Sequence, residues 1–139
     1  MKSGGTFTLA LLTWQAPVTV AGFVRLVECG YYNGLTFHRI EPNFVIQGGS
    51  PGANEHSGYG SFMRDEVGRA SNLRGSVALS TRGRNTGDGR WYVNPADNAR
   101  LDHNYTVFAN VMSGMDVVVG MMERDQIAEI TIVEAKKVR

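Results

Sequence analysis

Three side chains within a short stretch could form a binding or catalytic site: Arg39, Phe44 and Gln47. The guanidinium group of arginine is planar, stays positively charged and offers several N–H donors. The side-chain amide of glutamine both donates and accepts hydrogen bonds. Phenylalanine adds an apolar wall, so a ligand could be held against it while the arginine donates to it. A lone arginine on a strand is more often a solvated charge or an ion-pair partner, so its neighbours decide between these interpretations.

The elements that must position these residues are two short strands. Two apolar runs, 36–40 and 44–47, flank the sequence Glu-Pro-Asn at 41–43, and Pro and Asn favour turns. Side chains alternate between faces along a strand, so Phe37 and Glu41 are expected on the same face as the arginine between them. The twist and bend of the hairpin would then bring the arginine, phenylalanine and glutamine onto one surface.

The same stretch resembles the signature of the cyclophilin-type peptidyl-prolyl isomerases. The residues that carry the resemblance are Phe37-His38-Arg39-Ile40 and Phe44-Val45-Ile46-Gln47-Gly48-Gly49, with Tyr31-Tyr32-Asn33-Gly34, Arg74-Gly75, Ala78-Leu79-Ser80, Asn85-Thr86, Leu101-Asp102, Tyr105-Thr106-Val107-Phe108 and Gly114-Met115-Asp116-Val117-Val118. These blocks follow the family's order over most of the chain, and we expect a divergent, bacterial-type member. The resemblance implies a mainly β fold, a closed eight-stranded antiparallel β-barrel capped by two α-helices.

The implied activity is rotation about X-Pro peptide bonds in protein substrates, which assists folding, with Arg39 as the catalytic residue. Rotation has a barrier of ~18–20 kcal/mol because the C–N bond has partial double-bond character. Twisting leaves a lone pair on the proline nitrogen, and a fixed guanidinium donor stabilises that state more than either planar ground state. No covalent intermediate, metal or cofactor is needed, so none is expected.

The resemblance also assigns a substrate groove. The residues implied to bind substrate are Phe44, Val45, Gln47, Thr81, Arg90, Tyr92, Leu101 and Tyr105. Phe44, Val45, Tyr92 and Leu101 would grip the proline ring, although apolar strand residues are as often plain core. Gln47 would contact the substrate backbone and orient the arginine.

Three positions depart from the family pattern. Tyr105 stands where many members have a histidine, Arg90 where they have a glutamine, and Arg100 where a large aromatic is common. Because that aromatic contacts cyclosporin in the family, we expect weak cyclosporin binding. The alternative function is a cyclophilin-like module that binds proline-containing segments with weak or no isomerase activity. The loss of activity would then be due to Tyr105 and Arg90.

Four arginines are expected around this groove: Arg82, Arg84, Arg90 and Arg100. The simplest interpretation is a solvated basic rim. The competing hypothesis is that rim charge favours substrates with acidic residues beside the proline.

Apolar periodicity places the other elements. A stripe at Val20, Phe23, Val24 and Val27 predicts a helix that starts at Pro17 and ends at Gly30. The predicted strands are 6–12, 75–80, 91–93, 106–111 and a closing strand at 127–133, with a second helix at 115–122. In the closing strand Ala128, Ile130 and Ile132 should share one face.

Composition sets only loose bounds. A chain of 139 residues suits one domain, 1–139. A formal net charge of +1 points to no particular partner, so we expect neither nucleic acid nor membrane. The family resemblance implies proline-containing polypeptides as partners, and we expect a monomer. The single cysteine, Cys29, is expected to be a small buried residue. The compartment stays open between cytoplasm and bacterial periplasm, and the chain is either free-standing or a domain of a longer one.

Other candidate chemistries find less support. Residues 48–52 match G-x-S-x-G, but a hydrolase elbow needs the N–H after Ser50, and Pro51 has none. The three histidines are too scattered for a metal site. A small-molecule-binding β-barrel is set aside because the family fills its barrel interior with side chains.

Overall fold

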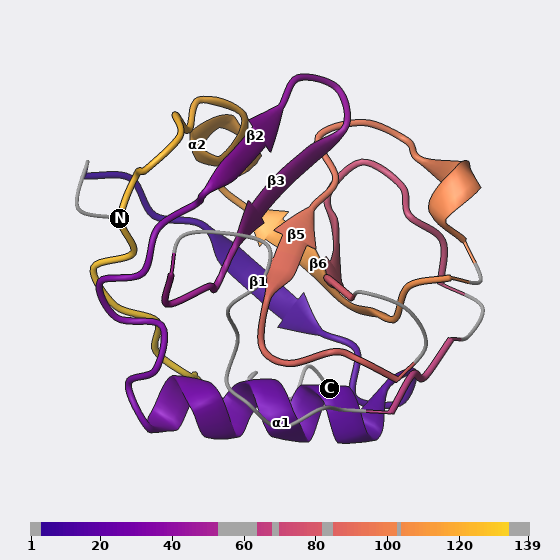
Figure 1. The fold of residues 1–139 in the computed structure, drawn as a ribbon. Helices are drawn as coiled ribbons and strands as arrows, with labels where there is room; N and C mark the ends of the chain where they lie inside the picture. The colour runs from indigo at the N-terminus through magenta and orange to yellow at the C-terminus, as the bar shows by residue number, and fades with distance from the viewer. Residues whose placement is uncertain (1–3, 53–63, 68–69, 82–84, 103, 134–139) are drawn as a thin grey trace, which may run out of the picture.

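A computed structural model describes residues 4–52, 64–67, 70–81, 85–102 and 104–133. Within these residues the fold is mainly β with helices at two sides (Figure 1). Its elements are β1 (Thr8–Leu11), α1 (Pro17–Glu28), β2 (Arg39–Glu41), β3 (Val45–Gly48), β4 (Ser76–Leu79), β5 (Trp91–Val93), the 3-10 helix η1 (Ala99–Leu101), β6 (Val107–Ser113) and α2 (Met115–Val119).

The strands form one antiparallel sheet in the order β1-β6-β4-β5-β3-β2. Its two edge strands, β1 and β2, do not pair with each other. The prediction of a closed eight-stranded barrel is therefore wrong for the part of the chain that the structure describes: the sheet there has six strands and is open. The mainly β character and the two α-helices are confirmed.

The sheet stays open because the predicted closing strand does not form. The Gly34 N–H donates to the Ile127 carbonyl at 2.7 Å, and the Ile127 N–H donates to the Leu35 carbonyl at 2.9 Å. This pairing stops there, and residues 128–133 are not in a strand. Ile127 is the buried residue, whereas Ile132 is 42% exposed, so the apolar positions do not follow the predicted two-residue alternation.

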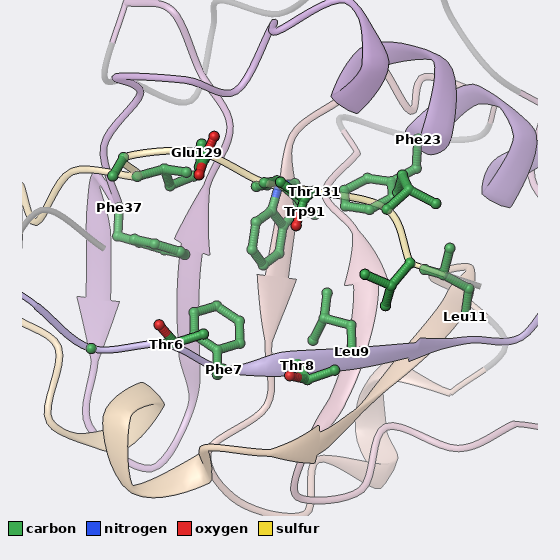
Figure 2. A pocket seen from close by; sticks show the side chains of 16 residues that line it. Thr6, Phe7, Thr8, Leu9, Leu11, Phe23, Phe37, Trp91, Glu129 and Thr131 are labelled. Atoms are coloured by element: carbon green, nitrogen blue, oxygen red, sulfur yellow. The ribbon is translucent and has the colours of Figure 1, made fainter. Parts of the chain in front are cut away.

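An apolar cavity of about 430 Å³ lies on this open side. Figure 2 shows β1 along one side of it and the C-terminal segment carrying Glu129 and Thr131 along the other, with Trp91 between them. Its apolar wall consists of Phe7, Leu9, Leu11, Phe23, Phe37, Trp91, Ile127, Ile130, Ile132 and Val133. A small-molecule-binding barrel is disfavoured if the interior is filled by side chains, as in the family. On this side of the sheet, however, the interior contains a cavity.

Helix α1 forms where its apolar stripe predicts. Pro17 occupies its first turn, where a missing N–H costs nothing, and Gly30 takes a left-handed φ of +73° just beyond its end. The buried face includes Phe23, whose ring lies 5.1 Å from that of Phe108 and 6.1 Å from that of Trp91. These aromatic contacts fix the helix against one face of the sheet (Figure 1).

The prediction that Cys29 is buried is wrong, because its side chain is exposed. Cys29 is the C-terminal cap of α1, two residues beyond the buried Val27. Two residues turn a helix by about 200°, so the cap points away from the face that packs on the sheet.

Candidate functional site

All nine residues assigned to the site from sequence line one pocket of about 110 Å³. The lining is Arg39, Phe44, Val45, Gln47, Ser80, Thr81, Arg90, Tyr92, Leu101 and Tyr105, so Ser80 is the one addition. Pockets for drug-sized ligands usually measure ~300–1,000 Å³. A pocket this small suits one side chain of a peptide better than a whole small molecule.

Strand register explains why residues far apart in the sequence meet here. Arg39 pairs with Gln47 between β2 and β3, Gln47 pairs with Tyr92 between β3 and β5, and Tyr92 pairs with Ala78 on β4. Directly paired residues point to the same face of a sheet. The row therefore lies on one face, where Val45, Ala78, Tyr92 and Val107 form an apolar cluster separate from the main core.

One predicted neighbour of Arg39 lies elsewhere. Phe37 is fully buried in the main core, with its ring 5.5 Å from that of Trp91. The expectation that it shares a face with Arg39 is wrong, because β2 begins only at Arg39 and the alternation does not extend back to residue 37. Glu41, which lies within the strand, does share that face.

Arg39 forms an ion pair with Glu41. The Arg39 Nε–H and Nη2–H donate to Glu41 Oε1 at 3.0 and 2.7 Å. The two side chains are 35% and 48% exposed, so solvent screens the pair. The guanidinium carbon also lies 5.8 Å from the centroid of the Phe44 ring. The arginine is therefore held in a defined orientation at the mouth of the pocket.

A second ion pair is buried, and its arginine, Arg90, lines the pocket. The Arg90 Nε–H donates to Asp88 Oδ1 at 2.9 Å, and the two side chains are 1% and 3% exposed. A buried charge is tolerated only when it is paired and hydrogen-bonded. The sequence analysis identified Arg90 but not its partner, although an acidic residue two positions before the arginine, just ahead of β5, was an available signal.

Tyr92 is anchored by a network of asparagines that sequence reasoning missed. Its hydroxyl donates to Asn72 Oδ1 at 2.8 Å, which also accepts from Asn94 Nδ2 at 3.0 Å. Asn98 Nδ2 donates to Asn94 Oδ1 at 2.9 Å and to the Phe44 carbonyl at 2.7 Å. The network thus ties two walls of the pocket together. Nothing local in the sequence marked these asparagines.

The chemistry of Tyr92 is that of a neutral phenol. Burial, followed by the proximity of Tyr105 and Asp102, raises the pKa of its hydroxyl well above the usual value. The Tyr105 ring packs edge-on against it, with centroids 5.8 Å apart. Both aromatic rings therefore present apolar surface to the pocket.

Arg100 adds a cation at the rim. Its guanidinium carbon lies 4.5 Å from the centroid of the Phe44 ring, within the ~6 Å range of a cation–π contact. It belongs to η1, whose last residue, Leu101, lines the pocket. The other two predicted rim arginines, Arg82 and Arg84, lie outside the described residues.

Other possible sites find no support in the described part of the chain. There, no three His, Cys, Asp or Glu side chains gather in a way that would hold a metal ion, and His56 and His103 lie outside it. Ser50 is 1% exposed, whereas a nucleophile elbow presents its serine to substrate. Among the described residues no helix is long and apolar enough to cross a membrane.

Comparison with known proteins agrees with the resemblance. A family model described as cyclophilin type peptidyl-prolyl cis-trans isomerase/CLD matches residues 1–137. A peptidyl-prolyl cis-trans isomerase-like 1 of Neurospora crassa is 36% identical over 97% of this chain and 90% of its own length. A peptidyl-prolyl cis-trans isomerase of Synechococcus elongatus is 34% identical over 93% of this chain and 90% of its own.

Solved structures agree as well. A cyclophilin type peptidyl-prolyl cis-trans isomerase of Cryptosporidium parvum superposes with a TM-score of 0.77 at 25% identity, covering 81% of this chain and 74% of that one. The chain therefore belongs to the cyclophilin-type peptidyl-prolyl cis-trans isomerase family. Its relatives include fungal and bacterial proteins, so the expectation of a bacterial type stays a prediction.

Proposed function

We propose that the 110 Å³ pocket binds a proline of an extended polypeptide and that Arg39 catalyses rotation about the preceding peptide bond. The observation that carries this proposal is the meeting of Arg39 with a small apolar pocket on one sheet face. Phe44, Val45, Tyr92 and Leu101 supply that apolar surface, and Gln47 lies directly opposite the arginine.

The separate roles of the pocket and of Arg39 follow from the chemistry of the X-Pro peptide bond. A pocket that holds the proline ring still lets the acyl part turn, which is catalysis by positioning. As conjugation is lost, the nitrogen becomes a hydrogen-bond acceptor, and the guanidinium is a charged donor. A hydrogen bond from a charged group contributes roughly 1.5–3 kcal/mol net, equivalent to a rate factor of about 10 to 150.

Proline-peptide binding has support from a second structure of the Cryptosporidium parvum protein. That structure was determined in the presence of the dipeptide Ala-Pro, and at 24% identity it shows the same fold as this chain. In our proposal Thr81, two residues after β4, lies along the substrate backbone, while Tyr105 and Arg90 close the pocket in place of the family's histidine and glutamine.

The proposal is tested by a protease-coupled proline isomerisation assay on an Ala-Pro peptide. Arg39→Gln removes the charged donor and should lower kcat/KM about 10- to 150-fold. Arg25→Gln, which removes an exposed arginine from the last turn of α1, is the matched control and should keep full activity. Full activity in Arg39→Gln, with unfolding curves unchanged, would refute the assignment of Arg39.

The second candidate is a binding module with weak or no turnover. The observation that favours it is the Glu41 carboxylate, which already accepts from two Arg39 N–H groups. If this pair restrains the arginine, Glu41→Gln should raise kcat/KM. If both the wild type and Glu41→Gln bind Ala-Pro peptides but neither accelerates isomerisation, the protein is this binding module.

A further inference from the structure

The pocket carries one uncompensated positive charge among the described residues. Two of its three nearby arginines have carboxylate partners: Arg39 is paired with Glu41, and Arg90 with Asp88. Arg100 is exposed and has no carboxylate partner among the described residues. Among the described residues, the charge left without a carboxylate partner at the pocket is therefore that of Arg100.

Arg100 is also held in place beside the pocket. Its guanidinium stacks on the Phe44 ring, and the adjacent Leu101 lines the pocket. The Phe44 carbonyl in turn accepts from Asn98 Nδ2 at 2.7 Å, one residue before η1 begins. Both partners of the cation–π contact are thus fixed to the same short segment.

The two nearby carboxylates that could neutralise Arg100 are directed elsewhere. Asp97 Oδ1 accepts from the Arg74 backbone N–H at 2.8 Å, and Asp102 Oδ1 accepts from the Asn72 backbone N–H at 2.7 Å. Each of these carboxylates thus accepts from a backbone N–H, and neither forms an ion pair with Arg100.

We infer that Arg100 is a specificity-determining residue, selecting proline segments that carry an aspartate or glutamate next to the proline. The inference rests on the proposed function of the pocket. Successive Cα atoms lie about 3.8 Å apart, so a carboxylate one residue from a proline packed on Phe44 can reach a guanidinium over the same ring. A lysine in that place meets like charge.

The effect should be modest because the charge is exposed. Solvent-exposed pairs contribute ~0.2–1 kcal/mol, which corresponds to a preference of roughly 1.4- to fivefold in kcat/KM for a glutamate peptide over its glutamine isostere. At 1 M salt, where the Debye length is about 3 Å, the preference should fall toward unity.

The test compares peptides with Glu, Gln or Lys directly before or directly after the proline, at low and high salt. Wild type and Arg25→Gln should show the preference Glu over Gln over Lys, and Arg100→Gln should lose it. Arg100→Lys keeps the charge and should retain part of the preference. Equal rates on Glu and Gln peptides in wild type, or an unchanged ratio in Arg100→Gln, would overturn the inference.

Failure of the underlying function has a different signature. If no peptide is isomerised, including neutral Ala-Pro, the proposed activity fails. The ratio of Kd values for the Glu and Gln peptides, measured by titration calorimetry on the same variants, then decides the charge preference by itself. Equal Kd values in wild type would overturn it.

Discussion

The buried pair of Arg90 and Asp88 should be the most sensitive electrostatic feature of the pocket. Asp88→Asn keeps the size of the side chain and an oxygen acceptor but leaves a guanidinium that is 1% exposed without its counter-charge. At an effective dielectric constant of ~20, unit charges at the observed 2.9 Å attract by about 6 kcal/mol before desolvation is counted. Removing one partner of a buried pair costs about 3–5 kcal/mol net.

That loss is a large part of the ~5–15 kcal/mol that stabilises a typical domain. Urea unfolding followed by tyrosine and tryptophan fluorescence should show a lower midpoint with an unchanged m value. Replacing both partners, Asp88→Asn with Arg90→Gln, removes both charges and should recover most of the loss. Glu41→Gln is the matched control, because it breaks an exposed pair and should cost less than about 1 kcal/mol.

The result that would refute this reasoning is a cost for Asp88→Asn no larger than that for Glu41→Gln. A double variant as unstable as Asp88→Asn alone would also contradict it, since the damage would then not come from an unpaired charge. Isomerase activity gives a second readout, because Arg90 lines the pocket.

Three further predictions concern other parts of the molecule. Gly49→Ala should cost more than about 3 kcal/mol in urea unfolding, because φ is +88° and a Cβ would lie 2.8 Å from the Gly89 carbonyl oxygen. Gly34→Ala, with φ +82° but open space, should cost only about 1–2 kcal/mol, and equal costs would contradict the clash. The raised pKa of Tyr92 means that the folded state binds the proton more tightly, so stability should fall as pH rises above ~10, by up to about 1.4 kcal/mol per pH unit. Tyr92→Phe should reduce that slope between pH 10 and 11, and an unchanged slope would exclude this tyrosine as its source. Cyclosporin should bind weakly by calorimetry and more tightly to Arg100→Trp, whereas a tight wild-type complex would refute the prediction.

Much of the local structure was predictable because it depends on near neighbours. The stripe from Val20 to Val27 determines which face of α1 is buried, and Pro and Asn at 42 and 43 favour the hairpin turn, where Asn43 takes a φ of +57°. The nine site residues could be assigned because the family motifs occur in order, and they do meet at one pocket. Their individual roles, and the single domain 1–139, stay predictions.

What the sequence by itself determined was therefore most of the helices and strands, but not the predicted closing strand, together with the side chains available to the site. Tertiary structure alone decided which charges are paired: Asp88 with Arg90 and Glu41 with Arg39, leaving Arg100 without a carboxylate among the described residues. It also decided that residues 128–133 do not complete the sheet. The physical reason is that periodicity reports only which face of an element is apolar, whereas ion pairing and strand pairing depend on distances set by other parts of the chain.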